Sequence, residues 1–267
     1  MIRQPVVAGL FYPSSTSELK RQLASFITTT EEQKEVSAAI LPHAGYVYSG
    51  DVAGEVISRI KVPQLVVLLG PNHHGRGGQI AVTGADSWVT PLGEVAIAAD
   101  FRTYLLNQIP QLTVDDRSHE QEHSLEVLLP FLQYVQPQLN VVPVALKDLD
   151  LEESSRFGES LARAINNWNQ PVLLVASSDM NHFLPAQENA RLDARAIAAM
   201  TRFDPSGLYQ VVDENQISMC GVLPVVSVMA AAKALGAQHC ELVRYSHSGE
   251  KSGDNSRVVG YAGLLID

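Results

Sequence analysis

Cysteine, basic clusters and long apolar runs are all scarce in this sequence of 267 residues. Its two cysteines, Cys220 and Cys240, are too few for a disulfide framework, and they favour a reducing compartment where a thiolate is free to bind metal. No apolar run reaches the roughly 20 residues that span a bilayer. The apolar stretch before Tyr12 is also too short for a signal peptide. We therefore expect a cytoplasmic protein with no membrane partner.

Positive charge and the common nucleotide and hydrolase motifs are lacking as well. The net charge is −10 and no run of Lys or Arg occurs, so we expect no nucleic-acid partner, because such a partner requires a basic face. The sequence contains no G-x-G-x-x-G, no phosphate-loop lysine motif and no G-x-S-x-G elbow. It therefore carries no fingerprint of a dinucleotide-binding protein, a P-loop NTPase or a serine hydrolase.

Short apolar runs alternate with helical patterns along the whole chain, and no linker divides it. This alternation predicts a single α/β domain over residues 1–267, with a mixed, largely parallel sheet and helices on both faces. The segment 75–95 has turn residues between short apolar runs and predicts a meander or hairpin. The expected strands are 37–41, 65–69, 79–83, 139–145, 171–176 and 258–265. The expected helices are 16–28, 51–60, 99–108, 124–135, 151–167, 187–202, 205–213 and 222–235.

Histidines follow three of these predicted strands within a few residues. His43 follows the first, His73 and His74 follow the second, and His182 comes after strand 171–176. Ligands collect just beyond the carboxyl ends of the strands in open α/β sheets, so the pattern predicts a metal or acid/base site. Successive side chains diverge on extended backbone, so we expect only one of His73 and His74 to be a ligand.

Asp179 and His182 are three residues apart, which places them on one face if the chain is helical there. A carboxylate beside an imidazole raises its basicity and fixes its tautomer, so the pair could serve as a base with its orienting group. Asp179 could instead bind metal. The alternative is a simple N-cap, since residues 177–179 are all good capping residues.

Two further signals are ambiguous. His119, Glu120 and His123 form an H-E-x-x-H, the zinc-protease motif, but polar residues fill its middle and the apolar face begins only at Leu125, which argues against a protease. His123 is still expected to line a pocket. Cys220 precedes an apolar helix whose N-terminus would lower the pKa of the thiol, although a buried structural cysteine is the commoner case.

Several spaced motifs occur in the order AGLFYPSS, LPHAGYVYSG, LLGPNHHG, TPLGEV, EHSLEVLLPFLQ, ASSDMNHF and SMCG. Over nearly its whole length the sequence thereby resembles the Memo-like family, whose bacterial and archaeal members are called AmmeMemoRadiSam system protein B. This family looks like a relative of the class III non-haem iron extradiol dioxygenases of the LigB type. The resemblance implies the same α/β architecture.

The resemblance also implies a pocket. His43, His73 and Cys220 match the family's metal-site residues, while Asp179, His182 and His123 line the same pocket and are the candidate catalytic groups; His119 lies outside the shared pattern. A thiol stands where the dioxygenases have a carboxylate, and this softer set suits one transition-metal ion, iron or copper, with zinc as a third option.

Three functions follow as hypotheses. The first is a Memo-like metal-binding protein with oxygen- or redox-linked chemistry, if it is an enzyme. The second is an active extradiol dioxygenase that cleaves a catecholic substrate. The third is a metal carrier, or a scaffold that binds a small molecule or peptide in the pocket. The family's names also imply a functional link to a radical-SAM protein and to an AMMECR-type domain protein.

Overall fold

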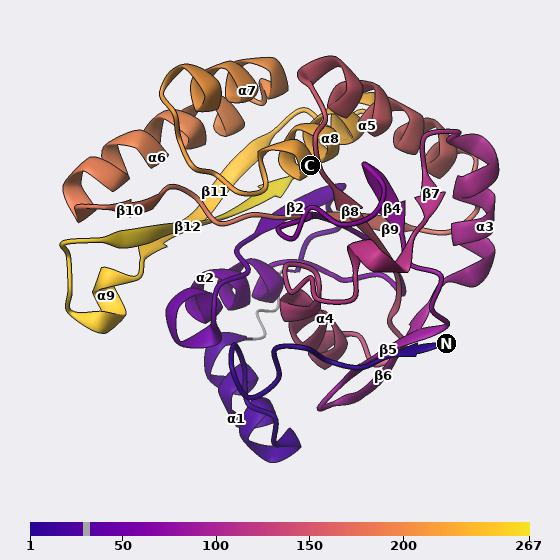
Figure 1. Cartoon of the computed structure of the whole chain (residues 1–267), viewed down its shortest axis with the longest axis horizontal. Coiled ribbons are helices and arrows are strands. Elements are labelled where there is room, and N and C mark those ends of the chain that lie inside the picture. Colours follow the sequence, from indigo (N-terminus) through magenta and orange to yellow (C-terminus); the bar gives the residue numbers. More distant parts are fainter. Residues whose placement is uncertain (29–32) are drawn as a thin grey trace.

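The computed structural model describes residues 1–28 and 33–267, and a twisted sheet runs through its centre (Figure 1). Four parallel strands form the middle of this sheet, in the order β8 (Asn140–Leu146), β3 (Leu65–Pro71), β9 (Val172–Ser177) and β2 (Ala38–Leu41). All but the first residues of β8 and β9 are buried, as expected for parallel strands that are covered on both faces.

Antiparallel strands extend the sheet at the β2 edge. β12 (Val258–Ile266) lies antiparallel to β2 and pairs in turn with β10 (His182–Leu184) and β11 (Cys240–His247). On the other side β6 (Gly93–Ile97) runs parallel to β8 and forms a hairpin with β5 (Ser87–Thr90), which pairs with β1 (Ile2–Arg3). β4 (Ile80–Val82) pairs with β8 and with β7 (Thr113–Val114). The prediction of a mixed α/β fold is confirmed, as is the hairpin within 75–95.

Two hydrophobic cores lie on opposite faces of the sheet. Leu65, Val67 and Leu69 of β3 belong to one core, whereas the intervening Val66 and Leu68 belong to the other, because successive side chains of a strand point to opposite faces. The first core includes residues of α3 (Ala99–Gln108), α5 (Leu151–Asn166), α6 (Ala186–Thr201), α7 (Pro205–Glu214) and α8 (Val222–Ala234). The second includes residues of α1 (Thr16–Phe26), α2 (Tyr46–Ser58) and α4 (Leu129–Val135).

Two predicted helices differ from the structure. α2 begins at Tyr46, five residues before the predicted start, and the N–H of Tyr46 donates to the carbonyl of Phe11. The predicted helix 124–135 begins as the 3₁₀ turn η2 (Glu126–Leu128) and becomes α-helical only at Leu129. Pro130 contributes to this break, since it has no N–H for the bond to residue 126. No helix in the described ranges is long and apolar enough to cross a membrane.

Candidate metal centre at the carboxyl ends of the parallel strands

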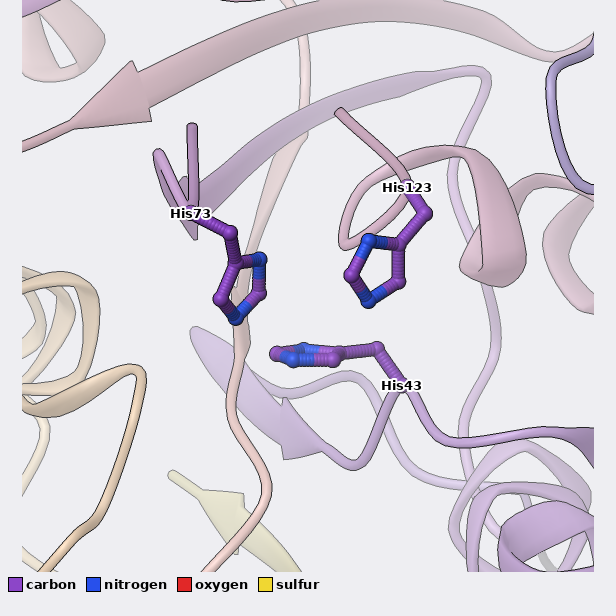
Figure 2. Close-up of side chains that lie close together, drawn as sticks. All are labelled: His43, His73 and His123. Carbon is purple, nitrogen blue, oxygen red and sulfur yellow. The ribbon is translucent and has the colours of Figure 1, made fainter. Parts of the chain in front are cut away.

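Three imidazoles face one another beyond the carboxyl ends of the central strands (Figure 2). His43 follows β2 and His73 follows β3, each two residues after the last residue of its strand, while His123 comes from the turn before η2. One nitrogen of each ring lies within 4.8 Å of the others. His43 is buried, His123 is half-buried and His73 is exposed, so the cluster opens to solvent on the His73 side.

The tautomer of His43 is set by a hydroxyl whose own proton is already used. The Ser177 hydroxyl, at the end of β9, donates to the carbonyl of Ser124 at 2.7 Å. It therefore accepts from Nδ1 of His43, which lies 2.7 Å away. Burial, followed by the charges of His73 and His123, holds the pKa of His43 well below its usual value. His43 is thus a neutral imidazole with a lone pair on Nε2, the form that binds metal.

The carboxylate of Glu122 sets the tautomer of His73. Nδ1 of His73 lies 2.8 Å from one carboxylate oxygen, and the backbone N–H of His73 donates to the other at 2.6 Å. Burial raises the pKa of Glu122, but the hydrogen bonds and charge of His73 outweigh it and lower the pKa to about 2. The carboxylate is therefore ionised and can only accept, so Nδ1 of His73 carries the proton, and Nε2 is the nitrogen that has the lone pair when the ring is neutral.

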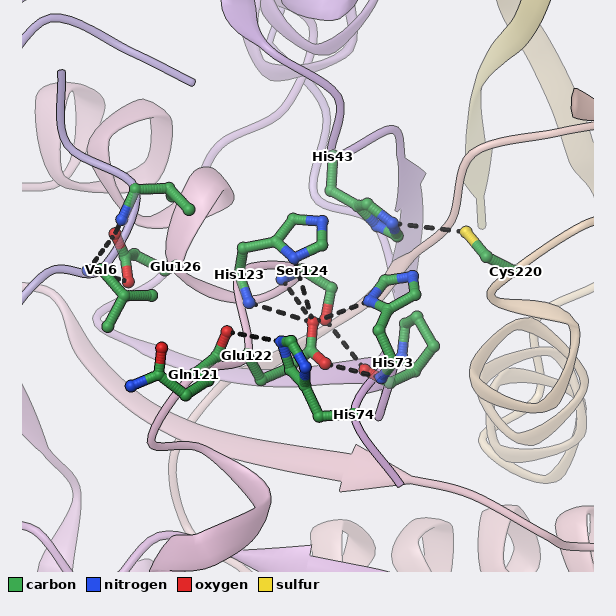
Figure 3. A network of polar contacts seen from close by, with 12 residues as sticks. Val6, His43, His73, His74, Gln121, Glu122, His123, Ser124, Glu126 and Cys220 are labelled. Carbon is green, nitrogen blue, oxygen red and sulfur yellow. Dashed lines mark hydrogen bonds and ion pairs between the residues drawn. The ribbon is translucent and has the colours of Figure 1, made fainter. Parts of the chain in front are cut away.

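The same carboxylate shapes the turn that carries His123. One oxygen of Glu122 also accepts from the backbone N–H groups of His123 at 3.0 Å and Ser124 at 2.9 Å (Figure 3). Arg3 fastens this turn to the N-terminal segment, because it donates to the carbonyl of Glu122 and pairs with Glu126, both at 2.7 Å. The sequence singled out only His123 from the EHS motif. The role of Glu122 could not be predicted, because the atoms that its carboxylate binds come partly from the distant residue His73.

Cys220 lies directly beside His43. Its Sγ is 3.3 Å from Nε2 of His43 and accepts from the backbone N–H of Asp179 at 3.3 Å. Gly221 permits this approach, since a Cβ there would lie 2.3 Å from the carbonyl oxygen of Ser177. The helix N-terminus was expected to lower the pKa of the thiol, but burial, followed by the charge of Asp179, raises it. Cys220 is therefore a protonated thiol, and its proton has two acceptors within reach, Nε2 of His43 and the carbonyl of Asp179 at 3.7 Å.

Asp179 and His182 are not joined by any hydrogen bond among the described residues, and the helical turn that would place them on one face is absent. Asp179 instead accepts from the backbone N–H of His43 at 2.8 Å and so holds the His43 loop. Burial raises its pKa to about 7 despite that bond. His182 is bound to Ser218, through its backbone N–H at 2.8 Å and its Nδ1 at 2.9 Å.

His74 and His119 lie outside the cluster. Nε2 of the exposed His74 is 2.9 Å from the carbonyl of Gln121. His119 is buried against Trp88, and its Nε2 is 3.1 Å from the carbonyl of Ala81. His119 follows the 3₁₀ turn η1 (Asp116–Ser118) rather than lying in an α-helix, so the H-E-x-x-H does not form the two-histidine helical face of a zinc protease.

The donor atoms are grouped around one point, but more widely than the ligands of a bound ion. Two nitrogens that bind a tetrahedral ion at about 2.1 Å are about 3.4 Å apart, and the three nitrogens here lie within 4.8 Å of one another. A thiolate and an imidazole on a tetrahedral ion are roughly 3.6 Å apart, compared with 3.3 Å between Cys220 and His43. The imidazole nitrogens would therefore have to close in by up to about 1.4 Å to bind one tetrahedral ion.

Fold and site together define an α/β protein with an imidazole cluster at the carboxyl edge of a mixed sheet. The family model described as Memo-like protein matches residues 3–265, and the chain belongs to that family. It is 41% identical to a MEMO1 family protein of Aquifex aeolicus, with 99% of both chains covered. It is 40% identical to one of Archaeoglobus fulgidus, again over 99% of both chains.

A solved structure shares the fold. The crystal structure of an uncharacterized Escherichia coli K12 protein matches with a TM-score of 0.61 and 16% sequence identity, covering 87% of this chain and all of the other. At this identity the match supports the architecture alone. The relation to extradiol dioxygenases stays a prediction.

Proposed function

We propose that this protein binds one transition-metal ion between His43, His73 and His123, with Cys220 as a further or alternative ligand. The observation that carries the proposal is the pair of fixed tautomers. Ser177 and Glu122 each hold an Nδ1 proton, so the Nε2 lone pairs of His43 and His73 are left for the ion. Imidazole with a thiol suits iron, copper or zinc.

A bound ion of this kind would supply Lewis acidity, or one-electron chemistry if it is iron or copper. The residues of the chain hold the site ready for it. Asp179 fixes the His43 loop through its backbone N–H, and Glu122 fixes both His73 and the turn of His123. The burial of His43 keeps water from one side of the cluster, while exposed His73 leaves an entry path.

An extradiol dioxygenase needs a carboxylate ligand beside two histidines. Glu122 is already used, because it accepts from an imidazole and three backbone N–H groups. Asp179 accepts from the backbone of His43 through one oxygen, and burial raises its pKa to about 7, which disfavours the anion that a metal ion binds. The donor set therefore favours metal binding by imidazole and thiol over catechol cleavage. Reconstitution with Fe(II) without oxygen, followed by catechols and oxygen, tests this, since formation of a ring-cleavage chromophore would overturn it.

Metal binding is tested by titrating metal-free protein with Fe(II), Cu(I) and Zn(II) and measuring bound metal. We expect one ion per chain, and a loss of at least tenfold in affinity in His43→Ala and His73→Ala. His123→Ala and Cys220→Ser then separate the two ligand sets, because the variant that removes a true ligand weakens binding most. His74→Ala is the matched control on the neighbouring exposed histidine. Unchanged affinity in both His43→Ala and His73→Ala would refute the proposal.

A further inference from the structure

His182 is held by two hydrogen bonds to one residue. Its Nδ1 is 2.9 Å from the carbonyl oxygen of Ser218, and its backbone N–H donates to the Ser218 hydroxyl at 2.8 Å. A carbonyl can only accept, so Nδ1 carries the proton and the neutral ring has its lone pair on Nε2. His182 lies near enough to the cluster that the charge of His73, after burial, lowers its pKa.

Ser218 is itself held by a buried amide. Its backbone N–H and its hydroxyl both donate to the side-chain oxygen of Asn181, at 2.9 and 3.1 Å. The amide nitrogen of Asn181 donates to Asn189 at 2.8 Å, which fixes the orientation of the Asn181 side chain. The hydrogen bonds thus run from His182 through Ser218 and Asn181 into the interior on α6.

The network ends at Asp193, a carboxylate with no exposed surface. It accepts from the backbone N–H of Asn181 at 2.8 Å, from the Asn189 amide at 2.9 Å and from the Tyr245 hydroxyl at 2.7 Å. No ion pair to Asp193 is found among the described residues, so its burial costs stability. The β12 strand makes room for it only through Gly260, where a Cβ would lie 1.9 Å from the carboxylate.

The burial of Asp193 lowers stability, and its hydrogen-bond network ends on the imidazole of His182. These are features of a group that orients a histidine. We propose that Asp193 is a positioning residue that acts through Asn181 and Ser218 to hold His182 as the Nδ1–H tautomer. This tautomer is a property of the metal-free protein and does not rest on the proposed function.

The tautomer is measured directly by long-range ¹H–¹⁵N correlation NMR on metal-free, ¹⁵N-labelled protein, with His182 assigned from His182→Gln. In the wild type we expect one tautomer, protonated at Nδ1. Asp193→Asn should convert it to a mixture of both tautomers, because it breaks the network at its buried end. Ser218→Ala keeps the carbonyl that Nδ1 faces but removes the hydroxyl that ties His182 to Asn181, so the ring is held less firmly and a mixture is expected there as well. Because Ser218 is exposed, Ser218→Ala is expected to fold even if Asp193→Asn does not.

Asp150→Ala is the control, since Asp150 caps α5 and touches no member of the network. It should lower stability and leave the His182 tautomer unchanged. An Nε2–H tautomer or a mixture in the wild type would overturn the proposal. A single Nδ1–H tautomer that persists in both Asp193→Asn and Ser218→Ala would also overturn it. If metal titration fails while these NMR results hold, the proposed function falls and the positioning role stands.

Discussion

Replacing Glu122 with glutamine keeps the size of the side chain but removes the charge on which four N–H groups converge. Those groups are the backbone and Nδ1 of His73 and the backbones of His123 and Ser124. A glutamine has one oxygen to accept with, and its NH₂ group must face at least one of these donors. The variant therefore leaves a buried donor unpaired at the centre of the imidazole cluster.

The magnitude follows from the pKa of Glu122, which the fold lowers from 4.5 to about 2. At about 1.36 kcal/mol per pKa unit, the ionised carboxylate stabilises the fold by at most roughly 3 kcal/mol, because the part of the shift that comes from a charged His73 is lost when that ring is neutral. Because the folded pKa is depressed, this contribution is fully present above the unfolded value and is lost as the pH falls through 2. Denaturant unfolding at pH 7 should show Glu122→Gln less stable than wild type by up to roughly 3 kcal/mol, with a smaller difference near pH 3.

Metal affinity should fall as well, by about 10- to 100-fold, since the partner that orients a metal-binding histidine is lost. Glu126→Gln is the matched control. It breaks a buried pair with Arg3 and should destabilise by a comparable amount, about 3–5 kcal/mol, without touching His73. Equal metal affinities in the two variants would refute the orienting role of Glu122. An unchanged unfolding free energy in Glu122→Gln would refute the electrostatic argument.

Three further outcomes follow from single contacts. Gly221→Ala should lower the unfolding free energy by about 1–3 kcal/mol and weaken metal binding, since the added Cβ would meet the Ser177 carbonyl. Wild-type values in both denaturant unfolding and metal titration would contradict this. Burial lowers the pKa of His119 to about 4, so the free energy of unfolding of the wild type should fall by up to about 3 kcal/mol as the pH drops from 6.5 to 4. In urea unfolding, His119→Gln should reduce this dependence of stability on pH. Burial raises the pKa of Asp193 to about 6, so its effect on stability has the opposite sign: the free energy of unfolding falls by up to about 3 kcal/mol as the pH rises from 4 through 6. If Asp193→Asn showed the same dependence of stability on pH as the wild type, this explanation would be wrong.

The sequence predicted the elements whose signal is local. The central strands appear as uninterrupted apolar runs, and α3 matches its predicted range of 99–108 because its pattern and its ends lie within one short segment. β11 was missed, since five of its eight residues are only partly buried and it shows no uninterrupted apolar run. The early start of α2 depends on a carbonyl of Phe11, which is a distant contact.

The same limit applies to the site. Parallel strand ends meet at one sheet edge, so the proximity of His43 and His73 followed from their positions after two apolar runs. The hydroxyl of Ser177 and the carboxylate of Glu122 were not readable as orienting groups, because each acts on a histidine from another segment. Asp179 and His182 were paired by spacing, which assumed a helix that is not formed there.

The contacts that build the centre also set when it can exist during folding. Arg3 reaches Glu126 across 123 residues, and His43 reaches Cys220 across 177. Such distant pairings carry a large loop-closure cost, so we expect them to form after the local helices and with the sheet. The emerging chain on the ribosome therefore lacks the complete set of donors until Cys220 has been made. An ion that reaches the folded protein enters through the side that His73 leaves open.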